Sequence, residues 1–374
     1  MRQEQYSLYV RPSSLVVSEC PESATKMASD RKNSMEQAVR SEINWRNGLF
    51  FLFVHLIALL ACIPWFFSWA GVVLCVAGTF VFGTLGMSIG YHRLFTHRGF
   101  KCPRWLECTI AVLGCCCGEE APAFWVAVHR KHHHHSDGED DPHSPLLGFF
   151  WGHVGWLLVK NNALNRYRVI DRYARDLQRD PFHHWLIQHD HWIHLFFASW
   201  FLFFAAGFAA ATGMGAGVSD AVQFGLSLMV WGCAVRTVMV WHQTWFVNSA
   251  AHLWGYRNYD THDDSRNNVW AGLFCNGDGW HNNHHADPSS ARHGHKWWEV
   301  DLSWLTIRVM MALRLVTDVA MPSPTLAANV KNASPALAPA EAAEPEHESR
   351  VQLAPDEQAS PRSRCRRRSN QAPR

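Results

Sequence analysis

The sequence predicts an all-α integral membrane protein with four transmembrane helices in two hairpins, joined to a helical cap that carries clustered histidines. Two uncharged stretches predict the spans. The stretch from Gly48 to His92 contains no Asp, Glu, Lys or Arg, and the stretch from Trp192 to Val235 contains only Asp220. A membrane-spanning helix needs roughly 20 apolar residues, so each stretch is long enough for two spans.

Each stretch carries a break near its middle. Pro64 and the segment 67–70 interrupt the first, and the glycine-rich segment 212–217 interrupts the second. We therefore expect one hairpin with spans at about 48–66 and 71–91, and another with spans at about 192–212 and 218–240. Buried helices of a soluble core are the alternative, but uncharged runs of this length are typical of membrane spans.

The basic residues predict the orientation. Neither hairpin turn contains Lys or Arg, whereas both residue types occur before the first stretch, between the stretches and after Val240. By the positive-inside rule, both termini and the central segment lie in the cytoplasm. We expect a largely disordered N-terminal segment at 1–44, a membrane-embedded domain at 45–320, and a disordered tail at 321–374 that is rich in Ala, Pro, Ser and Glu.

Composition by itself excludes few functions. The net charge of +2 at pH 7 does not indicate the kind of partner. The 11 cysteines include the run 115–117 but no Cys-x-x-Cys pair, which argues against a zinc ribbon or a redox dithiol. We expect most of them to be reduced packing residues.

Histidine is the unusual residue, with 24 copies concentrated in the charged segments next to the predicted spans. Four clusters have a spacing suited to metal ligands: His92-x4-His97, His129-x-x-His132-His133, Asn248-x3-His252 and His281-x-x-His284-His285. One such cluster alone would more often be a surface or core group. Four clusters on one side of a membrane indicate a metal centre at the cytoplasmic mouths of the hairpins.

Helix geometry makes these spacings usable. Residues three and four apart share a face, so the histidines of the second and fourth clusters can converge, and so can Asn248 with His252. His92 and His97 would lie roughly 140° apart on an α-helix at about 100° per residue. We therefore expect the helix to end between them. Imidazole suits iron, copper and zinc alike, so the spacing leaves the metal open.

Two other classes of metalloprotein fit less well. A histidine-rich metal transporter or sensor would place its ligands within the spans, along a path through the bilayer. A soluble carboxylate-bridged di-iron bundle would use Glu-x-x-His pairs on core helices. The pair of this kind, Glu344 with His347, falls in the predicted tail.

The four boxes and their flanks resemble the membrane fatty acid desaturases, in particular the branch with stearoyl-CoA-desaturase-like and bacterial Δ9 acyl-desaturases. That branch has the same boxes in the same order. The resemblance covers about residues 45–310 and includes the flanks Gly90-Tyr91-His92-Arg93-Leu94, Asp140-Asp141-Pro142-His143, Asn248-Ser249-Ala250-Ala251-His252 and Gly279-Trp280-His281-Asn282.

The resemblance implies that the cytoplasmic cap holds two iron ions (Fe2+/Fe3+), with no catalytic residue separate from the metal site. Asn248 would act through a metal-bound water. The implied iron ligands are His92, His97, His129, His132, His133, His252, His281, His284 and His285.

It also implies an O2-dependent enzyme that introduces a cis double bond, at Δ9, into a saturated acyl chain on coenzyme A, a lipid or a carrier protein. A separate ferredoxin or cytochrome b5-like donor would supply two electrons, because the sequence lacks the His-Pro-Gly-Gly motif of a fused cytochrome b5. We expect no fused heme or flavin, and no nucleic-acid partner. A hydroxylase of the same superfamily is the nearest alternative, but the His-x4-His and Asn-x3-His boxes favour the desaturase.

Helix geometry suggests a channel for the acyl chain. On an α-helix, Ser88, Thr84 and Phe80 face the same way as His92, because they lie at steps of four. They would lie roughly 6, 12 and 18 Å deeper in the membrane. We expect the methyl end of the chain to stop near Thr84, with Phe80 as the floor. Packing of these residues against another span is the alternative.

Overall fold

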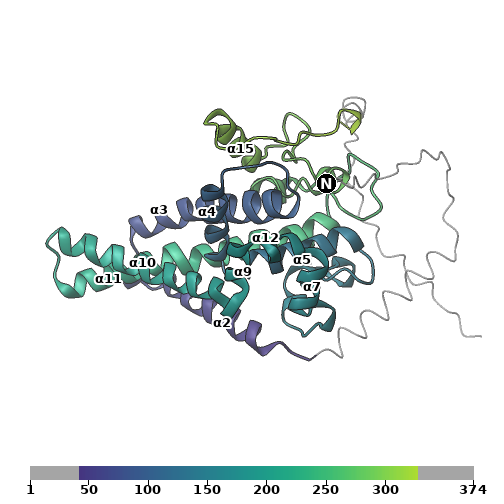
Figure 1. Cartoon of the computed structure of the whole chain (residues 1–374). Coiled ribbons are helices and arrows are strands. Elements are labelled where there is room, and N and C mark those ends of the chain that lie inside the picture. Colours follow the sequence, from purple (N-terminus) through teal and green to yellow (C-terminus); the bar gives the residue numbers. More distant parts are fainter. Residues whose placement is uncertain (1–41, 327–374) are drawn as a thin grey trace, which may run out of the picture. The chain divides into compact units, whose positions relative to one another are not determined.

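The computed structural model describes residues 42–326, which lie within one compact unit of the chain (Figure 1). Within this range the backbone is helical, with four isolated β-bridges and no strand. The predicted all-α architecture is therefore confirmed for the described part. The disorder predicted for both ends of the chain concerns residues that fall almost entirely outside it.

The first hairpin begins close to the expected position. Ile63 has an extended backbone and Pro64 opens a new turn, so the first span ends at the proline. Ser68 then starts the return helix, because its Oγ accepts a hydrogen bond from the Gly71 N–H at 3.0 Å. The two arms contain α2 (Trp45–Leu59), η1 (Leu60–Cys62) and η2 (Pro64–Phe66), followed by α3 (Trp69–Gly78) and the π-helix η3 (Thr79–Thr96).

The second hairpin turns at Gly215, which has a φ of 86°. Its helices approach closely where both carry glycine: a Cβ on Gly207 would lie 2.9 Å from the Gly225 Cα. The arms contain α9 (Pro181–Ile187), η7 (Gln188–Asp190) and α10 (His191–Gly213), followed by α11 (Val218–Met229), the π-helix η8 (Val230–Val235) and α12 (Arg236–Leu253).

The four predicted spans are confirmed, but the first ends four residues earlier than predicted, at Cys62, and the other three are longer than predicted. The helices long and apolar enough to cross a membrane are Trp45–Cys62, Trp69–Thr96, Pro181–Gly213 and Val218–Leu253. The second and fourth continue well past the predicted ends at 91 and 240. They continue because their ends are buried in the cap, where His92, Arg93 and His252 are at most 4% exposed.

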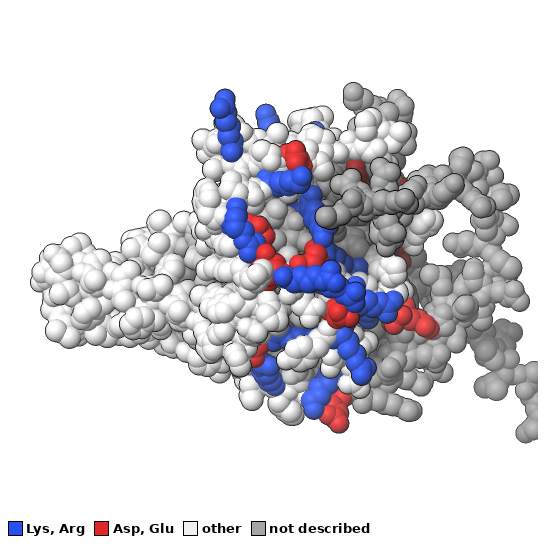
Figure 2. Space-filling model, in the orientation of Figure 1, with Lys and Arg blue, Asp and Glu red and all other residues white. Residues whose placement is uncertain are grey.

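The cap is built from the segment between the hairpins and from the segment after α12. On the face shown in Figure 2, charged side chains gather on the cap, and the tips of α10 and α11 show none. The cap elements are α4 (Arg104–Cys115), α5 (Pro122–His135), η4 (Pro145–Leu147), α6 (Phe149–His153), η5 (Gly155–Leu157), η6 (Asn162–Leu164), α7 (Arg166–Tyr173), α8 (Arg175–Arg179), α13 (Val269–Phe274), α14 (His281–Ala286) and α15 (Leu302–Ala312).

Arg130 of α5 fixes the cap to the first hairpin. Its guanidinium donates hydrogen bonds to the Thr96 carbonyl at 3.0 Å and to the Phe95 carbonyl at 2.7 Å. These carbonyls lie at the end of η3, where few intrahelical partners are available. Arg130 also pairs with Asp176 of α8 at 2.7 Å. The end of η3 is thereby held against α5, and both helices carry predicted ligands.

The orientation of these spans can be tested with reporter fusions. Fusions after Trp69 and Gly215 should report the outside, and fusions after Lys160 and Met321 should report the cytoplasm, because the basic residues lie on the cap side. Paired alkaline phosphatase and green fluorescent protein fusions would measure this. An outside signal after Lys160 would contradict the four-span orientation.

Candidate metal centre

A π-helix brings the first two predicted ligands together. Within η3, the His97 N–H donates to the His92 carbonyl at 3.2 Å, an i→i+5 hydrogen bond. A π-helix returns to the same side after about five residues rather than four. The rings of His92 and His97 lie 5.0 Å apart, with the helix end at Thr96 between them. The expectation that the helix ends between these histidines is therefore confirmed, but the helix runs four residues past His92 and has π rather than α geometry.

The other predicted ligands come from three more helices. α5 supplies three, the end of α12 supplies His252, and α14 supplies three, with His281 at its first position. The structure brings all nine predicted histidines into two groups, and the ring nitrogens within each group lie within 4.8 Å of one another. One group is His92, His97, His129, His133 and His284, and the other is His132, His252, His281 and His285.

The spacing of the ring nitrogens fits metal coordination. The Nε2 atoms of His92 and His284 lie 3.1 Å apart, those of His129 and His133 also 3.1 Å, and those of His281 and His285 3.0 Å. Two imidazoles at a right angle on one ion, each about 2.1 Å from it, would be separated by about 3 Å. Each group could therefore hold one metal ion.

Buried ring nitrogens without a partner support the same conclusion. Among the described residues, the Nε2 atoms of His97, His132 and His252 are buried and lack any hydrogen-bond partner. A buried unpaired polar atom costs about 1–3 kcal/mol. Coordination of a cation would satisfy these lone pairs.

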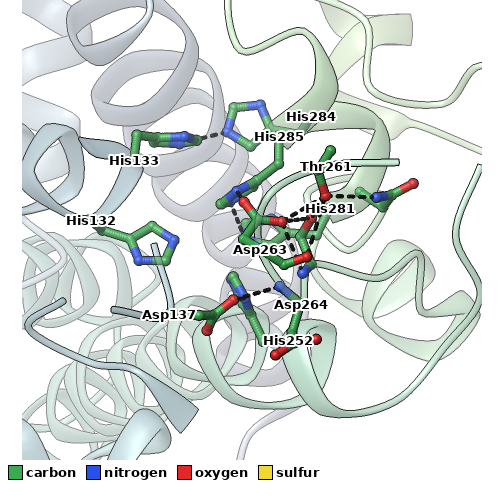
Figure 3. A network of polar contacts seen from close by, with 12 residues as sticks. His132, His133, Asp137, His252, Thr261, Asp263, Asp264, His281, His284 and His285 are labelled. Atoms are coloured by element: carbon green, nitrogen blue, oxygen red, sulfur yellow. Dashed lines mark hydrogen bonds and ion pairs between the residues drawn. The ribbon is translucent and has the colours of Figure 1, made fainter. Parts of the chain in front are cut away.

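Carboxylates hold several rings in the required tautomer (Figure 3). Asp137 lies 3.0 Å from the Nδ1 of His252, and Asp263 lies 2.5 Å from the Nδ1 of His285. Asp141 similarly lies 3.0 Å from the Nδ1 of His132. A carboxylate at Nδ1 keeps the hydrogen there and leaves the Nε2 lone pair for a metal.

Burial favours the neutral form of six of the nine histidines, which metal binding requires. It lowers the pKa of His285 to about 4, although Asp263 acts in the opposite direction. Burial alone would raise the pKa of Asp263, but the hydrogen bonds and charge of its partners, His285 first, together hold that pKa below its usual value. Burial, reinforced by neighbouring histidines, also holds the pKa well below its usual value in His97, His129, His133, His281 and His284.

The structure adds a buried network that the sequence analysis missed. His293 is fully buried, and its ring lies 4.5 Å from that of His284. Asp278 lies 3.4 Å from the Nδ1 of His92 and 3.3 Å from the Nδ1 of His293. Arg93 donates to Asp278 at 3.0 Å and also pairs with Asp301. Arg93 lies inside the first box but is not a histidine, and His293, Asp278 and Asp301 lie outside all four boxes, so the spacing of histidines could not reveal this network.

Two cavities meet at the histidine groups. A small one of about 40 Å³ is lined by His92, His129, Asn248 and His281, with Ser88. A space of this size and polarity can hold water. A larger cavity of about 340 Å³ runs between α2, α5 and α12 and also reaches His129 and Asn248. The structure thus places Asn248 beside both histidine groups, at the junction of the cavities.

The wall of the larger cavity contains a buried carboxyl group. Glu119 accepts hydrogen bonds from the Thr244 hydroxyl at 2.9 Å and from the Trp125 indole at 3.2 Å. Burial raises the pKa of Glu119 to about 8, against the effect of these two hydrogen bonds. Glu119 is therefore mostly uncharged at neutral pH, which suits an apolar guest beside it.

The expected row of channel residues is not brought together. Ser88 lines the small cavity, but Thr84 and Phe80 line neither cavity. Thr84 is fully buried, whereas Phe80 is 38% exposed. The prediction assumed an α-helix, whereas the backbone from Thr79 to Thr96 is a π-helix. The larger cavity instead lies between other helices.

The comparisons with known proteins agree with this site. The sequence model of the fatty acid desaturase family matches residues 67–312. An sn-1 stearoyl-lipid 9-desaturase of Anabaena variabilis is 40% identical over 75% of this chain and 96% of its own length. An sn-2 palmitoyl-lipid 9-desaturase of Nostoc is 38% identical over 77% and 94%, respectively. An acyl-CoA C20 Δ5-desaturase of Anemone leveillei is 36% identical over 72% and 80%.

The chain belongs to the fatty acid desaturase family, and the resemblance found in its histidine boxes is confirmed. The match covers both hairpins beyond residue 67 and the cap elements that carry the histidines.

Metal content tests the ligand set. Protein purified under reducing conditions should hold close to two irons per chain, and zinc can replace iron because both accept imidazole. His133→Ala and His285→Ala should each remove about half or more of the bound metal, measured by plasma mass spectrometry. His184→Ala, on an exposed side chain of α9, is the matched control. Full metal content in either ligand variant would remove that residue from the set.

The supporting carboxylates should also affect metal affinity. Asp263→Asn removes the negative charge that holds the His285 ring, so the metal affinity should fall roughly 10–100-fold. Competition with a chelator measures this change. Asp260→Asn, on an exposed neighbour, should leave the affinity unchanged. Equal affinities in the two variants would mean that Asp263 has no role in holding metal.

Proposed function

We propose that this protein is a membrane acyl-lipid desaturase that introduces a cis double bond at Δ9 of a saturated acyl chain. The observation that carries the proposal is the contact between a cavity of about 340 Å³ and His129, a member of one of the two groups of converging histidines. All nine histidines would bind two irons, and Asn248 would act through a metal-bound water.

The reaction explains why such a centre is needed. An unactivated C–H bond is beyond acid–base catalysis, and two bound irons would supply the oxidising power derived from O2. The overall change converts one CH2–CH2 unit, O2, two electrons and two protons into one CH=CH unit and two waters. The protein then has to bind the chain, orient it and keep water away.

Aromatic side chains of the cavity suit that task. Trp125 stacks on the His129 ring at 5.0 Å, and both side chains line the cavity. Trp241 and Trp245 line another side and are at most 4% exposed. An acyl chain placed among them would pass beside His129, within reach of the centre. Small-molecule sites usually have volumes of about 300–1,000 Å³.

The mouth of the cavity supports a lipid as the acyl carrier. Its arginines are already paired: Arg46 lies 3.3 Å from Asp190, and Arg166 pairs with both Asp190 and Glu120. Coenzyme A carries several phosphates, which favour unpaired arginines and lysines. The Nη2 of Arg166 and the Oε2 of Glu120 lie 3.2 Å apart in their ion pair, so among these atoms only the buried Nε of Arg166 is left as a donor without a partner. Esters and hydroxyls of a glycerolipid headgroup suit this neutralised mouth better than phosphates.

A separate protein would deliver the electrons. We propose a ferredoxin or a cytochrome b5-like carrier, in keeping with the absence of the His-Pro-Gly-Gly motif from the sequence.

Expression in a host that lacks its own desaturase tests the function. The lipids should gain a monounsaturated acyl chain with a cis bond at carbon 9, as measured by mass spectrometry after derivatisation. A hydroxylated product would identify a hydroxylase instead. The His133→Ala variant, which lacks one of the proposed iron ligands, is the control.

The purified protein can be used to test whether the acyl carrier is a lipid or coenzyme A. We expect turnover of stearoyl glycerolipid in vesicles and at least tenfold slower turnover of stearoyl-CoA, because the mouth lacks unpaired cations. Faster turnover of stearoyl-CoA would contradict the lipid proposal and leave the desaturase proposal intact.

A further inference from the structure

A second hollow lies on the far side of α5 from the histidine groups. Its volume is about 280 Å³, and it lies between α5, η6 and α7. The residues that line it are Lys131, His135, Asp140, Asn162, Ala163, Arg168, Val169, Arg172 and Tyr173.

The lining of this hollow is strongly basic. Lys131, Arg168 and Arg172 all contribute, and Asp140 is its one acidic member. Within residues 42–326, none of the three cations makes an ion pair, whereas the nearby Arg175 is paired with Asp171. Figure 2 shows Lys and Arg side chains across this part of the cap, over α5 and α7. Unpaired like charges repel one another, and a negatively charged partner would relieve that repulsion.

The hollow is separated from the metal ligands by the width of one helix. At about 100° per residue, Lys131 lies roughly 160° around α5 from His129 and His133, and His135 lies between Lys131 and His132, about 60° from His132. Tyr173 of α7 contacts this side of α5, since its hydroxyl lies 3.3 Å from the His135 Nε2. His135 is three residues from His132, less than one helical turn, or about 5 Å along the axis.

We propose that this hollow, with Arg168 and Arg172 at its rim, is the docking surface for an acidic one-electron carrier protein. The inference rests on the proposed function, because that reaction needs two electrons from a separate protein. An acidic carrier docked here would lie over α5, the helix that supplies three of the nine histidines. Tyr173 and His135 would then stand between the carrier and His132.

The surroundings of the hollow favour a protein partner over a bilayer. Surfaces that lie on a membrane expose large apolar side chains next to their basic residues. Between residues 161 and 179, the exposed large apolar or aromatic side chain is Tyr167 alone. Opposite charges on two proteins accelerate their association and orient them, as a transient carrier requires.

Binding of oxidised carriers tests the surface without any need for turnover. The full-length protein in nanodiscs of neutral lipid would be titrated with a plant-type ferredoxin and with the soluble domain of cytochrome b5. We expect at least one of them to bind, with a Kd that rises with salt. The double variant R168E/R172E should raise that Kd at least tenfold at unchanged metal content. Arg308→Glu, an exposed arginine of α15, should stay within twofold of the wild type.

Turnover separates docking from a structural effect. With the bound carrier as donor, the double variant should need at least tenfold more carrier for half-maximal rate. With dithionite, which needs no docking, it should match the wild type.

Equal losses with both donors, or no binding of either carrier to the wild type, would overturn the proposal. If the double variant instead lost binding to vesicles of anionic phosphatidylglycerol and bound the carrier as the wild type does, the hollow would be assigned to the membrane. A wild type that binds the carrier but forms no double bond would contradict the proposed reaction and not the surface.

Discussion

The structure depends on one constraint: nine imidazoles must stay neutral, buried and aimed at one another. In water such rings would hydrate and protonate, so the fold has to remove them from solvent. Burial lowers the pKa of six of them, and carboxylates such as Asp137, Asp141 and Asp263 hold individual rings from behind. Asp141 is itself buried, which is tolerable because it is hydrogen-bonded to a ring N–H. The cap is therefore organised as two layers, with histidines inside and carboxylates outside.

The same constraint explains the unusual backbone. Two ligands five residues apart are incompatible with an α-helix but suit the π-helix η3, in which i→i+5 hydrogen bonds replace the usual ones. It also explains why the second and fourth spans run on into the cap. A rigid helix that leaves the membrane can carry His92 or His252 to a defined position, whereas a flexible loop would lose conformational entropy in doing so.

Access to the centre is divided between three faces. The larger cavity reaches His129 from the side of α2 and α12 and is walled by tryptophans, so it suits an apolar chain. The small polar cavity lies beside both histidine groups and suits water or another small molecule. The basic hollow lies between α5, η6 and α7, and the backbone of α5 separates it from His129 and His133. Substrate, small molecules and electrons would thus arrive by separate routes that do not obstruct one another.

The sequence by itself determined the four spans, the hairpin pairing and all nine clustered histidines. Hydrophobic length and short-range spacing are local properties, and a bilayer or a helix face converts them directly into structure. It did not reveal His293, Asp278 or Asp301, because these residues approach the centre through contacts between distant segments. It also did not anticipate the two cavities beside the histidines, which Thr84 and Phe80 do not line. Only tertiary packing decided the helix type, the carboxylate layer and the cavities, because each depends on which surfaces meet after the chain has folded.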